Sequence, residues 1–218
     1  MASNGIVCHI LIQNEQLEQV DTFPYLGSLI TEDVECMTEF CTRLNRGQAM
    51  GTSLQKIWKS HSIPISTKIQ LMKALVWPVA TYGCESWTFR KNEETRLDAF
   101  EMKELRKILW WILWTAKKTN DWVLNKAGVK RELLDTVKTR KLAYYGHTMR
   151  KQGSCLEKEI MQGTMPGACR RGSPRTAWMD NINTWTGLPV EESIRMTEDR
   201  DKWRKYVYGV ADPGIEDG

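Results

Sequence analysis

Acidic residues are the first side chains in this sequence that could do chemistry, because close carboxylates hold the metal ions of two-metal phosphoryl-transfer enzymes. No Asp-Asp dipeptide occurs in the 218 residues, and the nearest approximations are Glu32-Asp33, Glu198-Asp199 and Asp199-Arg-Asp201. Each falls where a helix is expected to begin, and a carboxylate there stabilises the helix dipole. We therefore expect no catalytic residues, no bound metal and no cofactor.

Cysteines and histidines are the other possible metal ligands. The six cysteines form no Cys-x-x-Cys pair, and only three histidines could complete a site. The spacing of His147, Cys155 and Cys169 matches no established zinc pattern. We expect reduced, mostly buried thiols and no zinc. His147, near the end of a predicted helix, could contact phosphate or interact with the helix dipole.

Basic residues are concentrated in the middle of the chain. Residues 1–30 carry −3 and contain no Lys or Arg, residues 31–63 are balanced, residues 64–128 carry +4, residues 129–176 carry +7, and residues 177–218 carry −4. This asymmetry indicates a polyanionic partner for the middle of the chain. A solvated helical face would give the same pattern, so both interpretations stay open.

Length and composition bound the class of protein. A chain of 218 residues with 41% hydrophobic and 27% charged residues can build one large core or two small ones. Its longest apolar run, Ile108 to Trp114, is far shorter than the roughly 20 residues that cross a bilayer. The first basic residue is Arg43, so no secretory signal is predicted. We expect a soluble intracellular protein of the nucleus or cytoplasm, neither secreted nor in a membrane.

The elements that position these charges are predicted to be mainly α-helical. Residues 6–30 favour a short β-hairpin with a turn near Gln13-Asn14 and a tight turn at Tyr25-Leu-Gly27. Helical spacing of apolar residues then predicts helices that begin at Thr31, Thr67, Asn92, Asn120, about Lys130, Ser173 and Thr197. The expected domains are a hairpin over 1–30, a helical bundle over 31–150, a basic glycine-rich linker over 151–173 and a small helical tail over 174–218.

Several residues predict local features of these helices. Gly47 and Gly51, four apart, indicate close packing of another helix or a bend. Thr67 and Gln70 have the spacing of a capping box, Pro78 should kink its helix, and Gly128 should end one. Packing in the interior is expected for Trp58, Trp77, Trp87, Trp178 and Trp203.

Five local strings occur together in order: Tyr25-Leu-Gly-Ser28, Tyr82-Gly-Cys-Glu-Ser-Trp87, Trp114-Thr-Ala-Lys-Lys-Thr-Asn120, Tyr145-Gly-His-Thr-Met-Arg150 and Arg171-Gly-Ser-Pro-Arg-Thr-Ala-Trp-Met-Asp180. Together they resemble the C-terminal part of the endonuclease-reverse transcriptase of non-LTR (LINE-type) retrotransposons, over almost the whole chain. The resemblance implies the end of a polymerase palm at residues 1–30, then a thumb-like helical bundle and a C-terminal extension. The catalytic aspartates of that family's palm have no counterpart here, so we expect a catalytically incomplete fragment and no enzyme.

The resemblance and the charges together imply a thumb that holds RNA or an RNA–DNA duplex by its backbone, without reading sequence. Tyr25 and Gly27 would correspond to the turn that places the primer end, although closing the hairpin is the alternative role. The expected nucleic-acid contacts are Tyr25, Gly27, Lys56, Lys68, Lys73, Lys117, Lys118, Lys130, Arg131, Lys138, Arg140, Lys141, Arg150, Lys151, Arg170, Arg171 and Arg175.

The sequence departs from the family in two places. Trp110-Trp-Ile-Leu-Trp114 stands where a basic or polar residue is usual, and Cys169 and Ser173 stand where linker arginines are expected. The second change removes the arginine of a Gly-Arg-Pro core that can lie in the minor groove. Trp110 and Trp111 cannot be buried on one helix face, so they could drive self-association. The alternative function is a stand-alone helical protein-interaction module that uses the exposed surface which the palm would otherwise cover, including Trp110 and Trp111.

Overall fold

A computed structural model describes residues 10–18, 20–31, 37–109, 118–151, 155–162 and 178–211. The chain forms two compact units, Met1–Cys41 and Thr42–Gly218. The fold is mainly helical with a short antiparallel β part near the N-terminus, as the sequence predicts. Within the described ranges, no helix combines the length and apolar character needed to cross a membrane.

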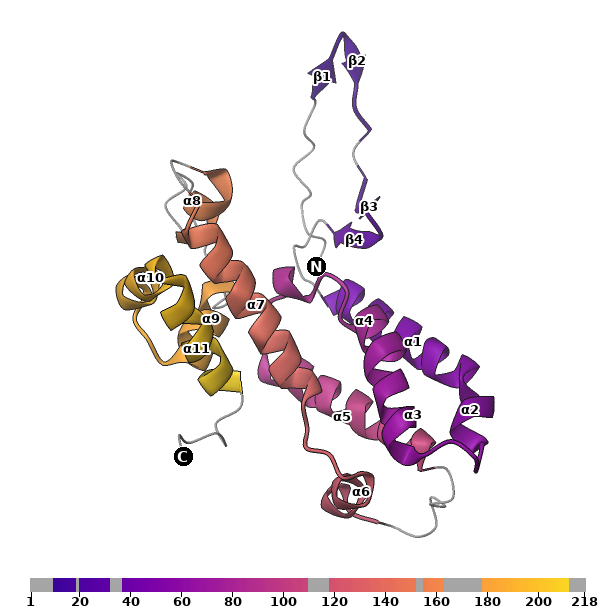
Figure 1. The fold of residues 1–218 in the computed structure, drawn as a ribbon. Helices are drawn as coiled ribbons and strands as arrows, with labels where there is room; N and C mark the ends of the chain where they lie inside the picture. Colours follow the sequence, from indigo (N-terminus) through magenta and orange to yellow (C-terminus); the bar gives the residue numbers. More distant parts are fainter. Residues whose placement is uncertain are drawn as a thin grey trace. The chain divides into compact units, whose positions relative to one another are not determined.

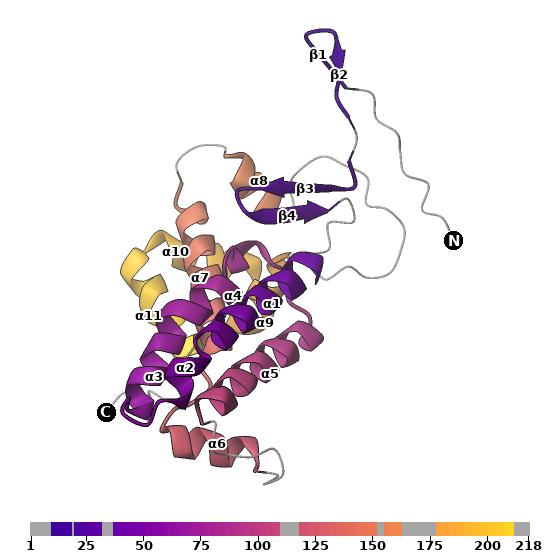
Figure 2. The ribbon, with the colours of Figure 1, turned by 90° about the vertical axis from the view of Figure 1, so that its right-hand side faces the viewer.

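The β part consists of two hairpins. Strand β1 (Leu11–Ile12) pairs with β2 (Glu15–Gln16), and β3 (Thr22–Tyr25) pairs with β4 (Ser28–Thr31), both antiparallel (Figure 2). The two central residues of each turn, Gln13 and Asn14 or Leu26 and Gly27, all have positive φ. Positive φ at both positions is the geometry of a type I′ turn, whose twist suits a two-residue hairpin. Both predicted turns are confirmed.

Helices make up the rest of the described chain. The first group is α1 (Met37–Ser53), α2 (Gln55–Lys59), α3 (Ile65–Leu71), the π-helical turn η1 (Met72–Val76), α4 (Trp77–Ala80), the 3-10 turn η2 (Cys84–Ser86), α5 (Lys91–Ile108), α6 (Asn120–Ala127) and α7 (Leu133–Met149). The second group is α8 (Leu156–Gln162), α9 (Trp178–Thr186), α10 (Val190–Glu198) and α11 (Arg200–Ala211). Helix α8 lies where the sequence predicts a linker. The glycine-rich segment from Gly163 to Ser173 and the predicted helix start at Ser173 lie outside the described residues.

Some predicted helix ends are confirmed. Helix α6 begins at Asn120, after Thr119 as N-cap, whose hydroxyl accepts a hydrogen bond from the Trp122 N–H at 3.3 Å. It ends at Gly128, which has a φ of 69°, a conformation that glycine adopts without strain. Asp199 caps α11, because its Oδ1 accepts hydrogen bonds from the N–H groups of Asp201 and Lys202. These backbone hydrogen bonds, that of Lys202 first, lower the pKa of the Asp199 carboxyl.

Two other predicted helix starts are wrong, and a third falls outside the described residues. Thr31 belongs to β4, and the segment between it and the described start of α1 at Met37 lies outside the described residues. Helix α3 begins at Ile65, directly after Pro64, and Thr67 lies inside it. Proline fixes an extended N-cap conformation that outweighs the weaker Thr67 signal. Thr197 is buried inside α10 and donates its hydroxyl proton to the Ile194 carbonyl, so it cannot cap α11.

The remaining two starts move by a few residues. Helix α5 begins at Lys91, one residue before the predicted Asn92. Arg90 is its N-cap residue, and the Glu93 carboxylate accepts a hydrogen bond from the Arg90 N–H at 2.8 Å. Helix α7 begins at Leu133, three residues after the predicted Lys130. Its first backbone N–H groups are held by a side chain from α5, a contact that local sequence does not reveal.

Pro78 disrupts its helix in a specific way. The π-helical turn η1 separates α3 from α4, and Pro78 lies in the first turn of α4. Proline has no N–H and its ring collides with the carbonyl one turn earlier, so a widened turn accommodates it. The predicted kink therefore takes the form of a π-helical turn.

Gly47 and Gly51 allow α1 to pack closely against its neighbours. A Cβ at Gly47 would lie 2.8 Å from the Ala80 Cβ, and one at Gly51 would lie 2.0 Å from the Glu104 Oε2. The Gly51 carbonyl also accepts a hydrogen bond from the Trp58 indole at 2.6 Å. Figure 2 shows α1 and α5 side by side. Of the two predicted roles for these glycines, close packing of another helix is the correct one.

Helix α7 lies at the centre of the Thr42–Gly218 unit, between α5 and the helices α9 to α11 (Figure 1). One hydrophobic core joins it to the C-terminal helices, and its members are Leu142, Tyr145, Met149, Ile182, Trp203 and Val207. The tail predicted from the sequence thus shares a core with the bundle. Among the tryptophans expected inside, Trp58, Trp77, Trp87 and Trp203 are buried and Trp178 is half-buried, whereas Trp110, Trp111 and Trp114 lie outside the described residues.

Candidate nucleic-acid interface

The two compact units carry opposite charges. The Met1–Cys41 unit contains no Lys or Arg and seven acidic residues, a net charge of −7. The Thr42–Gly218 unit contains all 31 Lys and Arg residues and the remaining 20 of the 27 Asp and Glu residues, a net charge of +11. The modest overall charge of +4 therefore hides a strongly basic helical unit, which is where a polyanion would bind.

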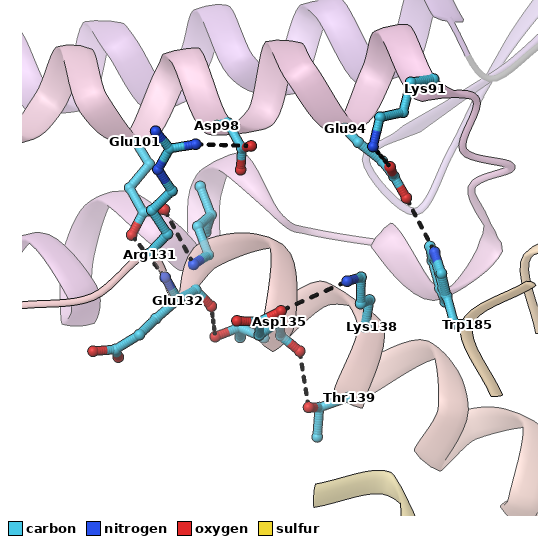
Figure 3. A network of polar contacts seen from close by, with 12 residues as sticks. Lys91, Glu94, Asp98, Glu101, Arg131, Glu132, Asp135, Lys138, Thr139 and Trp185 are labelled. Atoms are coloured by element: carbon cyan, nitrogen blue, oxygen red, sulfur yellow. Dashed lines mark hydrogen bonds and ion pairs between the residues drawn. The ribbon is translucent and has the colours of Figure 1, made fainter. Parts of the chain in front are cut away.

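Carboxylates neutralise several of the predicted contact residues. Figure 3 shows part of this network, in which Asp98 of α5 faces Arg131, just before α7, and Asp135 faces Lys138 within α7. Each pair is partly exposed, so each stabilises the fold by less than about 1 kcal/mol and leaves the cation partly available. The four ion pairs are Lys73–Glu132, Arg131–Asp98 at 3.5 Å, Lys138–Asp135 at 3.7 Å and Lys151–Glu157.

Lys68 and Lys141 are corrections to the predicted interface. The Lys68 ammonium is buried and donates to the carbonyl oxygens of Trp58 and Ser60, both at 2.7 Å. Lys141 has no exposed surface and also binds groups inside the protein. Phosphate cannot reach either ammonium group. Sequence alone missed this because a lysine on a helix is normally solvated.

The other predicted cations of the described chain reach the surface. The guanidinium of Arg140 donates a hydrogen bond to the Thr81 hydroxyl at 2.8 Å, and that of Arg150 donates one to the Thr197 carbonyl at 3.0 Å. Both acceptors are neutral. Besides Arg140, the predicted cations that are exposed and pair with no described carboxylate are Lys56, Lys118 and Lys130. Lys117, Arg170, Arg171 and Arg175 lie outside the described residues.

Tyr25 and Gly27 lie in the β3–β4 hairpin, in the unit without Lys or Arg. Tyr25 is 56% exposed, and Gly27 adopts a φ of 81° in the turn. The structure thus places Gly27 in a role that closes the hairpin. No cation of the same unit accompanies these residues, although a phosphate contact would normally require one.

A cluster of cations on α5 was missed by the sequence analysis. Lys103, Arg106 and Lys107 lie three and four residues apart in the helix, and Arg106 donates to the Lys118 carbonyl at 3.0 Å. We call Lys103, Arg106, Lys107 and Lys118 the α5 cation cluster. Residues at i, i+3 and i+4 share a helix face, and this spacing was visible in the sequence.

Neutral groups and one buried acid hold the α5 cation cluster. The Gln48 side chain and carbonyl accept hydrogen bonds from the ammonium groups of Lys103 at 2.8 Å and Lys107 at 3.3 Å. Lys107 also pairs with the buried Glu104 carboxylate at 2.7 Å. Burial raises the pKa of the Glu104 carboxyl, and the ammonium of Lys107 opposes that rise. Lys103, Arg106 and Lys118 have no described carboxylate partner.

Glu101 is a buried acid that holds the start of α7. Its carboxylate oxygens accept hydrogen bonds from the N–H groups of Glu132 at 3.2 Å and Leu133 at 3.4 Å (Figure 3). Burial is the largest influence on this group and raises the pKa of Glu101 to about 7, although the two backbone N–H groups act in the opposite direction. The carboxyl therefore titrates near neutral pH in the folded protein.

Replacement of Glu101 by Gln should remove a pH-dependent component of stability. The folded pKa of about 7 exceeds the ordinary value of 4.5, so between these values the folded state keeps a proton that the unfolded state has lost. Stability therefore falls as pH rises from about 4.5 to about 7, by on the order of 3 kcal/mol, and is level above that range. Urea unfolding across this pH range should show a flatter profile for Glu101→Gln than for Glu94→Gln on the same helix. Equal slopes for the two variants would contradict this assignment.

Cysteines and metal ligands offer no competing site within the described residues. Cys84 is buried, and burial raises the pKa of its thiol to about 12, which makes it a poor nucleophile. Cys41 and Cys155 are half-buried. Across the ranges that the structure describes, no group of three or more His, Cys, Asp or Glu side chains is placed to hold a metal ion.

Lys141, which was predicted to contact nucleic acid, has a structural role inside the protein. Its ammonium donates to the Trp87 carbonyl at 2.6 Å and to the Asn181 Oδ1 at 2.8 Å, and it lies 4.6 Å from the centre of the Trp178 ring. Asn181 also bonds both backbone groups of Phe89: its Oδ1 accepts from the N–H at 2.8 Å and its Nδ2 donates to the carbonyl at 2.6 Å. We call Phe89, Lys141 and Asn181 the Asn181 junction.

Several of the strings singled out in the sequence meet around this junction. Trp178 donates its indole N–H to the Glu85 carbonyl at 2.8 Å, which joins α9 to η2. The hydroxyls of Tyr145 and Ser193 are 2.7 Å apart, which joins α7 to α10. Residues of these strings thus contact other parts of the protein, and their contacts attach the C-terminal helices to the bundle.

Comparison with known proteins gives evidence about the origin of the sequence. The chain is 29% identical over 205 residues to a transposon-derived protein of Caenorhabditis elegans, an alignment that covers 88% of this chain and 72% of that protein. The similarity indicates a transposable-element origin. No protein-family model matches the sequence, and no solved structure matches it. The five strings predicted that the sequence derives from a transposable element, and the transposon-derived relative agrees with that prediction.

Proposed function

We propose that the chain corresponds to the thumb and C-terminal extension of a LINE-type reverse transcriptase, and that its Thr42–Gly218 unit binds RNA or an RNA–DNA duplex by the backbone. On this proposal the chain has no polymerase activity of its own. The transposon-derived relative and the five strings support the origin. The charge of the helical unit supports the binding.

The segregation of charge is the observation that carries this proposal. A unit with a net charge of +11 attracts a phosphate backbone, and each phosphate that a Lys or Arg neutralises releases a condensed counterion. Binding of this kind needs exposed cations and no particular base. The structure offers such cations, because Lys56, Lys130 and most of the α5 cation cluster have no described carboxylate partner.

The α5 cation cluster is the most specific part of the proposed interface. Arg106 is held by the Asn120 side chain at 2.9 Å and by the Lys118 carbonyl, so its guanidinium is oriented before any ligand binds. The Lys118 ammonium lies 5.3 Å from the centre of the Trp122 ring. An ordered cation loses less conformational entropy when it contacts phosphate. We therefore expect this cluster to contribute more than isolated surface lysines.

Neutralising the cluster should weaken nucleic-acid binding much more than neutralising cations elsewhere. The variant Lys103→Gln/Arg106→Gln/Lys118→Gln leaves the Lys107–Glu104 pair intact and should bind an RNA–DNA duplex about 10- to 100-fold more weakly at moderate salt. Its slope of log affinity against log salt should become shallower by about 1 for each lost phosphate contact. Fluorescence anisotropy over a salt series measures both quantities.

The matched control carries the same charge change at the other end of the unit. Lys202, Arg204 and Lys205 are exposed on α11, in a region of net negative charge, so Lys202→Gln/Arg204→Gln/Lys205→Gln should change affinity less than about threefold. Equal losses in the two triple variants, or affinity that ignores salt, would contradict the proposed interface. Primer extension by the wild-type chain would contradict the absence of polymerase activity.

A second candidate function is supported by the β part of the chain. Large apolar side chains are normally covered, yet those of the two hairpins are about half exposed or more. They are Ile10, Leu11, Ile12, Leu17, Val20, Phe23, Tyr25, Leu26 and Ile30. This favours a protein-interaction module, although the surface differs from the one expected around Trp110 and Trp111, which lie outside the described residues.

A further inference from the structure

The β3–β4 hairpin has one apolar face that is open. Phe23 pairs with Ile30, and Tyr25 is two residues after Phe23, so these three side chains lie on the same face of the hairpin. Phe23 and Ile30 are each 54% exposed, and Tyr25 is 56% exposed. Two aromatic rings and a branched aliphatic chain are the residue types that stabilise protein interfaces when they are buried. We call Phe23, Tyr25 and Ile30 the hairpin face.

The middle of each edge of this hairpin cannot accept another strand. Pro24 and Leu29 are opposite one another, and Pro24 has no N–H to donate. The Leu29 N–H is already used, because it donates to the Glu39 Oε2 of α1 at 3.0 Å. A partner strand would find no free backbone donor at either position. Contact through the hairpin face is therefore favoured over addition of a strand.

The charge around the hairpin face indicates what can bind it. Glu15, Glu18 and Asp21 are exposed in the adjoining segment, and the whole Met1–Cys41 unit has no cation. A phosphate backbone would be repelled, and two copies of the face would bring like charges together. A protein surface with an apolar centre and a rim of Lys or Arg would match both the side chains and the charge.

We propose that the hairpin face is a docking site for a protein partner whose apolar surface is bordered by basic residues. The inference rests on the second candidate function, and it reassigns Tyr25 from nucleic-acid binding to protein binding. Burial of Phe23, Tyr25 and Ile30 removes apolar surface from water, while the acidic segment favours the orientation that places partner cations near it. The helical unit remains available for nucleic acid.

A synthetic amphipathic helical peptide of leucine and lysine is a suitable probe, tested on the full chain by fluorescence anisotropy. The wild-type chain should bind it, and it should bind the matching leucine–glutamate peptide at least about tenfold more weakly. The variant Phe23→Ser/Ile30→Ser should lose at least about tenfold in affinity for the leucine–lysine peptide. The control Thr22→Ser, on the opposite face, should bind as the wild type does.

A charge variant tests the second half of the inference without touching the apolar pairs. Glu15→Gln/Glu18→Gln/Asp21→Asn should weaken peptide binding by a factor of about 3 to 10 and reduce its dependence on salt. Hydrogen exchange at the backbone amides that pair β3 with β4 shows whether the hairpin persists in each variant. If Phe23→Ser/Ile30→Ser unfolds the hairpin, the charge variant decides: unchanged peptide binding would overturn the proposal.

Other results would also overturn the inference. Unaltered peptide affinity in a folded Phe23→Ser/Ile30→Ser variant would show that the hairpin face is not used. A loss of duplex affinity in that variant would assign the face to nucleic acid, and a wild-type dimer that the variant abolishes would assign it to a second copy. Duplex binding by the α5 cation cluster is measured separately, so failure of that proposal is distinguishable from failure of this one.

Discussion

Replacement of Asn181 by alanine is expected to lower the free energy of unfolding by on the order of 4 kcal/mol. Asn181 is buried, and its amide satisfies the Phe89 N–H, the Phe89 carbonyl and the Lys141 ammonium. Alanine leaves all three groups without this partner. It also leaves a space that water would fill incompletely. Each unsatisfied buried polar group costs about 1–3 kcal/mol, and the ammonium more. Urea unfolding followed by far-UV circular dichroism measures the loss.

Aspartate at position 181 separates the contribution of the ammonium from that of the backbone. Asn181→Asp keeps oxygens for Lys141 and for the Phe89 N–H, but it replaces the donor to the Phe89 carbonyl, 2.6 Å away, with an acceptor oxygen. The attraction between the new carboxylate and the Lys141 ammonium opposes that repulsion, so the variant should cost less than alanine. A double-mutant cycle with Lys141→Met should show a coupling of at least about 1 kcal/mol between the two side chains. An alanine variant within about 1 kcal/mol of the wild type would contradict a structural role for the junction.

Replacement of Gly146 by alanine is expected to cost about 3 kcal/mol, because it forces α7 and α11 apart. A Cβ at Gly146 would lie 2.3 Å from the Trp203 Nε1 and 2.5 Å from its Cδ1. Trp203 is buried, and its indole donates to the Leu142 carbonyl at 3.0 Å, so the ring cannot move without losing that hydrogen bond. Overpacking costs about 1–3 kcal/mol, and the disturbed hydrogen bond adds about 1.

Gly209 supplies the matched control for this prediction. It lies in α11, and among the described residues no atom beyond its chain neighbours and the backbone of its own helix lies within 4 Å of a Cβ placed there. Gly209→Ala should therefore stabilise the protein by about 0.5–1 kcal/mol, because alanine favours the helix and meets no obstacle. Opposite signs for the two substitutions in thermal unfolding would confirm that packing against Trp203, and not helix propensity, determines the effect at Gly146.

Local sequence was sufficient for the elements that depend on neighbouring residues. The Gln13-Asn14 and Leu26-Gly27 turns and the Gly128 helix end follow from backbone conformations that few residues adopt. The predicted start of α7 failed because a distant group intervened. The start of α7 depends on Glu101, a residue of α5, and no pattern within residues 130–133 could reveal it.

The candidate interface was predicted less well than the fold, for a related reason. Lys68 and Lys141 have the same local pattern as a solvated lysine, and only the packing of distant carbonyl groups around them shows that they are buried. The cations of the α5 cluster were visible as a spacing, yet charge totals by segment gave more weight to residues 129–176. Totals along the sequence do not show which cations face carboxylates across a helix interface, as Arg131 faces Asp98.

The Asn181 junction has a consequence for synthesis on the ribosome. Asn181 lies 92 residues after Phe89 and 40 residues after Lys141, so both leave the exit tunnel well before their partner does. Until then the nascent bundle exposes an unpaired backbone segment and the apolar face of α7, surfaces that chaperones and proteases recognise. We expect the Thr42–Gly218 unit to reach its native state only after Asn181 has left the tunnel, at a rate limited by this long-range closure.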